Sequence, residues 1–166
     1  MDKDRKNLPF RKNSEGYLIL GESLICRDTE WGYIDFPGGG VEDDEDLREA
    51  LKREAFEEAG VILDGELKEL GTLKTIWPSD WAKNEKQKKR FEKYQGDDMH
   101  FFVGKVKELV EPKGDGEEEG WDVNERLMPI KRAIEIIMSY EPFPKELEQY
   151  YEFKLKILNN LLNKKV

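Results

Sequence analysis

Apolar side chains recur along the chain at spacings typical of short strands. Two runs, 16–20 and 23–26, are separated only by Gly21 and Glu22, so they predict a hairpin with those two residues as its turn. Three further segments have apolar residues at strand-like spacing: 31–36, 67–77 and 99–106. The pattern therefore predicts a sheet of several strands.

A helix is predicted over 44–59, because this stretch has no Gly or Pro, consists mainly of good helix formers and is followed by Gly60. Its acidic residues crowd the front end, where they suit the helix dipole. Two later segments, 123–140 and 142–166, also have apolar residues at helical spacing. We expect the first to pack on the core, and the second to form an extra C-terminal helix that caps the core or makes a homodimer.

The order of these elements fits one domain that spans all 166 residues, a length that can bury a core. Residues 1–15 are largely charged, and we expect them to form a loosely ordered lead-in to that domain. Residues 78–98 are polar and interrupt two predicted strands. A loop or helical excursion of that length in a compact domain is usually functional or disordered.

Three carboxylates continue the apolar face of the predicted 44–59 helix. At about 100° per residue, Glu54, Glu57 and Glu58 fall in the sector that Leu47 and Leu51 occupy one or two turns earlier. Like charges that point toward the protein are costly unless a cation neutralises them. Because all the candidate ligands are hard oxygens, Mg²⁺ or Mn²⁺ is favoured over zinc, and the chemistry implied is phosphoryl or pyrophosphoryl transfer.

A plain alternative is a solvated charged helix, since 39% of the residues are Asp, Glu, Lys or Arg. The glycine-rich turn 37–40 speaks for the metal site, because it leads directly into the helix and its backbone can approach a ligand closely.

The segment from Gly39 to Val61 resembles the Nudix box. Gly39 is followed by five residues and Glu45, then by seven residues and the run Arg53-Glu54-Ala55-Phe56-Glu57-Glu58-Ala59-Gly60-Val61. The resemblance implies an α/β fold, a Nudix-type α/β/α sandwich with a mixed sheet. It also implies hydrolysis of a phosphoanhydride bond in a nucleoside diphosphate linked to another moiety.

The resemblance further implies roles for the matching residues. Glu57 and Glu58 correspond to paired Mg²⁺ ligands, and Glu54 completes the metal site or accepts a proton from the attacking water. Arg53 orients a catalytic carboxylate, and Glu45 is its structural partner. The carbonyl of Gly38 or Gly39 is a further candidate metal ligand.

Other parts of the site are less specified by the sequence. Glu117, Glu118 and Glu119, in the turn-rich segment 111–120, are candidates for a further acid, although the segment could equally be solvated. For substrate binding, aromatic and basic residues outside the box are candidates for base stacking and phosphate binding: Trp77, Trp81, Lys89 and Arg90. An arrangement of surface lysines beside core aromatics would explain the same pattern. We assign the sequence to no Nudix subgroup.

The net charge of −9 argues against general binding to nucleic acid or membrane surfaces, although residues 83–93 form a local basic stretch. A single cysteine, Cys26, cannot form an internal disulfide, so we expect a reducing, cytoplasmic setting and a core position for this thiol. We expect His100, the only histidine, to be satisfied by a neighbour. No apolar run approaches the length of a membrane helix.

The sequence thus predicts a Mg²⁺-dependent (or Mn²⁺-dependent) pyrophosphohydrolase for a nucleoside triphosphate, nucleotide sugar or dinucleotide. Two alternatives are an mRNA-decapping hydrolase, which would act on capped RNA along the basic stretch 83–93, and a non-catalytic nucleotide sensor. Arg53, Glu54, Glu57 and Glu58 are all intact, which argues against the sensor.

Overall fold

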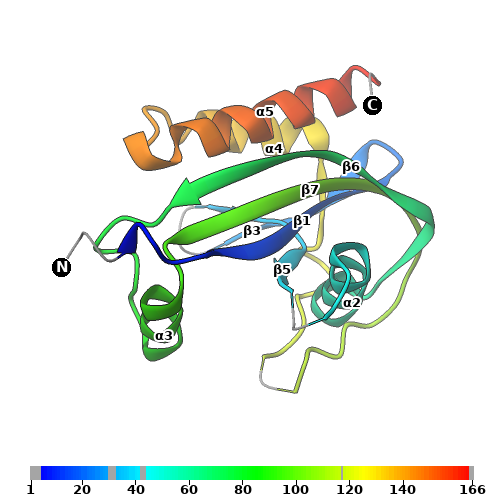
Figure 1. The fold of residues 1–166 in the computed structure, drawn as a ribbon. Coiled ribbons are helices and arrows are strands. Elements are labelled where there is room, and N and C mark those ends of the chain that lie inside the picture. The colour runs from blue at the N-terminus through cyan, green and yellow to red at the C-terminus, as the bar shows by residue number, and fades with distance from the viewer. Residues whose placement is uncertain (1–4, 30–32, 42–43, 117, 165–166) are drawn as a thin grey trace.

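The computed structural model describes residues 5–29, 33–41, 44–116 and 118–164, and it shows one main sheet with helices on both faces (Figure 1). The strands are β1 (Phe10–Leu20), β2 (Ser23–Ile25), β3 (Arg27–Asp28), β4 (Ile34–Asp35), β5 (Gly38–Gly40), β6 (Val61–Ile76), β7 (Gly96–Leu109) and β8 (Leu127–Pro129). The helices are α2 (Leu47–Ala59), α3 (Glu85–Lys93), α4 (Ile130–Met138) and α5 (Glu148–Leu162), with a 3₁₀ turn η1 (Lys145–Leu147).

The main sheet is mixed. Its strand order is β6-β7-β1-β2-β8, and β5 also pairs with β1. The central strands β1 and β7 run parallel, whereas the other pairs are antiparallel. The predicted hairpin is confirmed as β1 and β2, while β3 and β4 form a small separate sheet.

Helices cover both faces of this sheet, as Figure 1 shows, with α4 and α5 on one side and α2 on the other. Alternation along the strands supplies both cores. Tyr17 and Phe101 pack with α4 and α5, whereas their neighbours Leu18 and Phe102 pack with α2. The expected α/β/α sandwich with an extra C-terminal helix is therefore confirmed.

The expected loose lead-in is wrong for residues 10–15, which form the first half of β1. Asn13, Ser14 and Glu15 are buried there, and polar groups can be buried when they have partners inside the protein. The Asn13 amide donates to the Asp97 carboxylate on β7. Because that partner strand is far away in the sequence, the polar residues at 10–15 gave no local sign that they form a strand. Residues 1–4 lie outside the described residues.

Some other boundaries also differ from the sequence-based expectation. Strand β6 begins at Val61, directly after α2, because it pairs with β7 along most of its length through several register shifts. In the segment 123–140 only residues 130–138 are α-helical, and Leu127 lies in β8, where it pairs with Ile25. Helix α5 begins at Glu148 rather than at 142. Residues 31 and 32 of the strand expected at 31–36 are outside the described residues.

A buried ion pair fastens α5 to β1. Lys154 Nζ lies 3.1 Å from Glu15 Oε1, and the two side chains are 4% and 8% exposed. The Tyr150 hydroxyl donates to the same oxygen at 2.8 Å, and the Tyr17 hydroxyl donates to the other at 3.1 Å. The ammonium also lies over the Phe36 ring. The network holds α5 against the strand that pairs with the glycine strand β5.

Lys154→Met should lower the free energy of unfolding by about 3–5 kcal/mol, because it leaves the Glu15 carboxylate buried without its cation. Chemical denaturation at pH 7 measures the change. The double variant Glu15→Gln, Lys154→Met removes both charges and should recover much of the loss. A single variant as stable as the wild type would show that the ion pair does not fasten α5.

The single cysteine lies in the core, as expected. Cys26 is fully buried, and burial raises the pKa of its thiol to about 12, so the thiol is unreactive. None of the helices in the described ranges is long and apolar enough to cross a membrane.

Candidate active site

Helix α2 has defined caps that fix which residues lie on its inner face. The Asp46 carboxylate accepts hydrogen bonds from the backbone N–H groups of Arg48 and Glu49 at 3.2 and 3.4 Å. At the other end Gly60 adopts a left-handed conformation with φ 65°, as predicted for a residue that stops the helix. Because Leu51 is buried against the sheet, the carboxylates of the following turns lie at the edge of the core.

The glycine strand β5 lies beside these carboxylates. Gly38 has φ 153°, and a Cβ there would overlap the carbonyl of Ser14, so only glycine fits. Its backbone N–H donates to Glu58 Oε1 at 3.1 Å. A Cβ on Gly39 would lie 3.2 Å from Glu54 Oε1. The glycines thus let the backbone approach both carboxylates.

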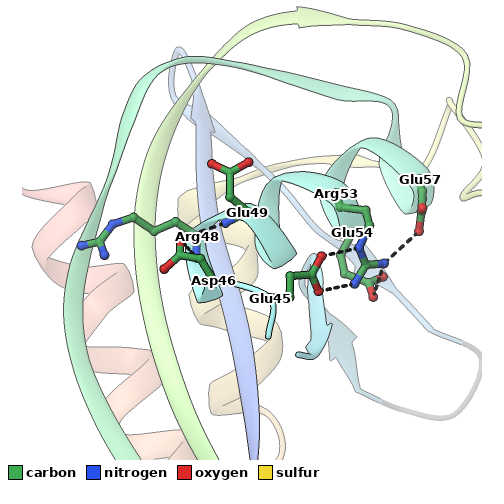
Figure 2. A network of polar contacts seen from close by, with 7 residues as sticks. All are labelled: Glu45, Asp46, Arg48, Glu49, Arg53, Glu54 and Glu57. Carbon is green, nitrogen blue, oxygen red and sulfur yellow. Dashed lines mark hydrogen bonds and ion pairs between the residues drawn. The ribbon is translucent and has the colours of Figure 1, made fainter. Parts of the chain in front are cut away.

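Arg53 lies at the centre of a carboxylate network (Figure 2). Its Nε and Nη2 donate to the two Glu45 oxygens at 2.9 and 3.0 Å, which makes the pair bidentate. Its Nη1 donates to Glu54 at 3.2 Å and to Glu57 at 3.3 Å. The hydrogen bonds to Glu45 and the nearby carboxylate charges raise the pKa of Arg53. The guanidinium therefore holds three acids in fixed positions.

Burial strongly affects the acids of this site. It raises the pKa of Glu58 to about 9, the charges of Asp35 and Glu54 add to the increase, and the hydrogen bond from Gly38 opposes it. Burial also raises the pKa of Glu54, against the effect of Arg53. Without a cation, the setting of Glu54 and Glu58 thus disfavours their charged forms.

The raised pKa of Glu58 predicts a pH-dependent stability of the metal-free protein. Between about pH 4.5 and 9 the folded state binds a proton on Glu58 that the unfolded chain has released, so stability should fall as pH rises, by at most about 1.4 kcal/mol per pH unit. Glu58→Gln should reduce this slope and stabilise the protein at pH 8. Urea unfolding in EDTA at pH 6 and pH 8 measures both effects, and an unchanged slope would contradict the burial of this charge.

The segment between β7 and β8 is tied to the last turn of α2. The N–H groups of Gly114 and Trp121 donate to the carbonyls of Glu57 and Glu58 at 3.0 and 2.7 Å. The buried Arg126 donates through Nη1 to the Ala59 carbonyl at 2.9 Å and also to the Val110 carbonyl. These bonds satisfy helix C-terminal carbonyls and place an acidic loop over the carboxylates.

A cavity of about 620 Å³ opens beside the network. Its lining combines glycine backbone, acids and bases: Arg11, Gly38, Gly39, Gly40, Val41, Arg53, Glu54, Glu57, Glu58, Lys86, Arg90, Asp115 and Glu118. A smaller hollow of about 110 Å³ shares five of these acids and adds Asp35 and Glu119. The three α2 carboxylates therefore line a cavity and do not simply point to the outer surface of the protein.

The acidic loop contributes to this lining. Glu118 and Glu119 line the hollows, whereas Glu117 lies outside the described residues. The sequence analysis missed Asp115, which lines both hollows and accepts a hydrogen bond from the Glu118 N–H at 2.7 Å. Its place in the same acidic loop could have marked it as a candidate site residue. Nothing in the sequence, however, shows which acids of this loop reach the cavity.

Of the four residues proposed for substrate binding, the structure brings only Arg90 to the cavity lining. Trp77 is buried, and its indole N–H donates to Asp97 at 2.7 Å. Trp81 stacks on it in parallel at 3.7 Å, so the two rings pair with each other, and Lys89 is exposed outside the cavity lining. The pattern of basic and aromatic residues did not show which side chains α3 would turn inward.

One ring nitrogen of His100 has the neighbour that was expected. His100 Nδ1 lies 3.2 Å from Glu69 Oε1 on the neighbouring strand, and the residue is not part of the cavity lining.

A family model described as NUDIX domain matches residues 8–151. This chain belongs to the Nudix family. The family's box falls on α2 and the glycine strand that were described above.

Other comparisons agree with the Nudix assignment. An RNA pyrophosphohydrolase from Bartonella bacilliformis is 33% identical over 69 residues, which are 35% of this chain and 41% of that protein, so the match spans less than half of the relative. A mutator MutT protein from Bacillus halodurans is similar in structure, with 14% identity, a TM-score of 0.51, and coverage of 88% of this chain and 82% of that one. A Nudix hydrolase from Nitrosomonas europaea has 15% identity, a TM-score of 0.51, and coverage of 87% and 88%. The two structures support the fold.

The Nudix carboxylates suit a hard divalent cation by their chemistry. Glu54, Glu57 and Glu58 supply only oxygen donors and line one cavity, and burial raises the pKa of Glu54 and of Glu58. Within the described ranges, however, no three acidic, histidine or cysteine side chains are already gathered around a point that could hold an ion. Arg53 draws two of the three toward itself.

Proposed function

We propose that this protein is a Mg²⁺-dependent pyrophosphohydrolase that cleaves a phosphoanhydride bond in a small nucleotide, with Mn²⁺ as a possible substitute for Mg²⁺. One observation supports it most: the α2 carboxylates and the cations Arg11, Lys86 and Arg90 line the same cavity. A phosphate chain between them would meet metal-binding oxygens on one side and hydrogen-bond donors on the other.

In this proposal Glu54, Glu57 and Glu58 hold the metal, with the Gly39 carbonyl as a further oxygen donor. When bound, Mg²⁺ would neutralise phosphate charge and acidify a water molecule. The chain's own contribution is positioning. Arg53 keeps Glu54 and Glu57 in place and is itself fixed by Glu45.

Glu54 is also the candidate proton acceptor. Its burial raises its pKa from the usual carboxyl value toward the range that a general base needs. The attacking water would give its proton to a Glu54 oxygen while the water oxygen bonds to phosphorus, and the bridging oxygen would leave with the departing phosphate.

Turnover of a substrate panel tests the proposal. Release of phosphate or nucleoside monophosphate is measured from nucleoside triphosphates, nucleotide sugars, dinucleotides and capped RNA, each with Mg²⁺ and with EDTA. We expect turnover of at least one small nucleotide in Mg²⁺ and none in EDTA. Folded protein that turns over no compound, or equal rates in both conditions, would overturn the proposal.

A second candidate substrate is the 5′ end of an RNA, including capped RNA. Helix α3 has no buried residue, and Lys83, Lys89 and Lys93 are exposed at or near it, away from the acidic cavity. These lysines could follow an RNA backbone, and the Bartonella relative bears the name of an RNA pyrophosphohydrolase. RNA turnover that falls steeply with salt, beside mononucleotide turnover that does not, would favour RNA.

Two other expectations stay predictions. A cytoplasmic location is predicted from the single cysteine, and a homodimer is predicted from the C-terminal helix α5.

A further inference from the structure

Three basic side chains form one wall of the main cavity. Arg11 comes from the start of β1, while Lys86 and Arg90 lie four residues apart on α3, so they share one face of that helix. Figure 1 shows α3 on the same side of the sheet as α2, which bears the opposing carboxylates. We call Arg11, Lys86 and Arg90 the basic wall.

The backbone beside Arg11 leaves room for its guanidinium. A Cβ on Gly40 would overlap the Arg11 guanidinium, so the glycine lets this group lie directly against the β5 backbone. Its Nη1 donates to Asn13 Oδ1 at 2.8 Å, and Asn13 is fixed in turn by Asp97. The guanidinium is therefore held in position beside the cavity.

Helix α3 is also held in place, although none of its residues is buried. Its N-cap Asn84 accepts from the Gln87 N–H at 2.8 Å. At its other end the Arg5 guanidinium donates to the carbonyls of Phe91 and Tyr94 and lies over the Phe91 ring. The cap defines where α3 begins, and the Arg5 contacts tie its C-terminal end to the N-terminal segment of the chain.

Two side chains of the basic wall have no ion-pair partner among the described residues. Among the described residues, neither Lys86 nor Arg90 forms an ion pair, whereas Lys88 on the same helix pairs with Glu85 at 3.2 Å. Asp97 is the nearby acid, and it already accepts from Trp77 and Asn13. Burial, and after it the charge of Arg90, lower the pKa of Arg11, whereas Asp97 and Glu54 raise it, so Arg11 and Arg90 are close enough to disfavour one another.

We propose that Arg11, Lys86 and Arg90 form a subsite for the distal phosphate of a triphosphate group, so that the enzyme selects triphosphates over substrates with only two linked phosphates. This inference rests on the proposed function. In this arrangement the scissile phosphates lie at the α2 carboxylates, and the third phosphate reaches the basic wall. Several cations around one phosphate give charge-assisted hydrogen bonds that a diphosphate cannot use.

The test compares a nucleoside triphosphate with a diphosphate sugar of the same nucleoside. The double variant Lys86→Gln, Arg90→Gln should lose about 50-fold or more in kcat/KM for the triphosphate, mainly through KM, whereas the loss for the diphosphate sugar should be at least about tenfold smaller. Lys88→Gln is the matched control and should leave both unchanged. Gly40→Ala, which displaces Arg11 without removing a charge, should cause a smaller loss with the same selectivity. Thermal unfolding confirms that each variant is folded.

Binding of inorganic triphosphate in metal-free buffer, measured by calorimetry, separates this proposal from the proposed function. If the wild type binds it and the double variant does not, the subsite stands even when no nucleotide is turned over. If the wild type is active but the double variant keeps its triphosphate kcat/KM, or loses activity equally on both substrates, the subsite is overturned and the proposed function is untouched.

Discussion

Glu57→Gln should lower kcat by at least about 100-fold in Mg²⁺, which corresponds to about 2.7 kcal/mol in the activation barrier. Gln keeps the shape of the side chain but removes the charge of a carboxylate that lines the cavity and accepts a hydrogen bond from Arg53 at 3.3 Å. In the proposed mechanism that charge holds the metal. Initial rates on the best substrate of the panel measure the effect.

Glu49→Gln is the matched control for this substitution. Glu49 lies on the same helix, its side chain is 66% exposed, and it pairs with Lys52 outside the cavity. Its substitution removes the same charge from α2 and should leave kcat within about twofold. Equal losses in the two variants would mean that the net charge of α2, and not the position of Glu57, determines the rate.

Arg53→Lys should lower kcat/KM by about 10–100-fold, the usual range for groups that orient metal ligands. Lysine keeps the positive charge but cannot make the bidentate contact to Glu45 while it also reaches Glu54 and Glu57. Because the acids would then be held less firmly, the variant should need more Mg²⁺ for half-maximal rate. Rates over a Mg²⁺ titration measure this shift.

A comparison with Arg48→Lys controls for the loss of a guanidinium on α2. Arg48 lies on the same helix, where its Nε donates to the Leu67 carbonyl at 3.1 Å, outside the cavity lining. This variant should keep the wild-type Mg²⁺ dependence. An Arg53→Lys enzyme with normal rates and normal Mg²⁺ dependence would contradict the positioning role of Arg53.

The parts of the site that the sequence predicted are local in the chain. Helical periodicity placed the three α2 carboxylates on one face, and Gly60 marked the end of the helix, because both signals lie within a few turns of the residues concerned. The contact between Arg53 and Glu45 was implied by the resemblance to the Nudix box, and the structure shows it at 2.9 Å.

The parts that the sequence did not predict depend on distant pairing. Arg11 joins the site because β1 begins at Phe10 and pairs in parallel with β7, and the polar residues of its first half concealed that strand. Lys86 reaches the cavity because of the position of α3, which depends on the tertiary contact of Arg5 with the C-terminal end of the helix. Trp77 is an aromatic residue of the kind that can stack on a base. In the structure its indole N–H donates to Asp97, so the side chain has a structural role.

Mn²⁺ binding to the wild type, Glu57→Gln and Glu49→Gln, followed by electron paramagnetic resonance, tests the central claim most directly. The account predicts the same Kd for the wild type and Glu49→Gln, and binding at least about tenfold weaker for Glu57→Gln. Equal Mn²⁺ affinity in all three proteins would contradict the assignment of the metal to the α2 carboxylates.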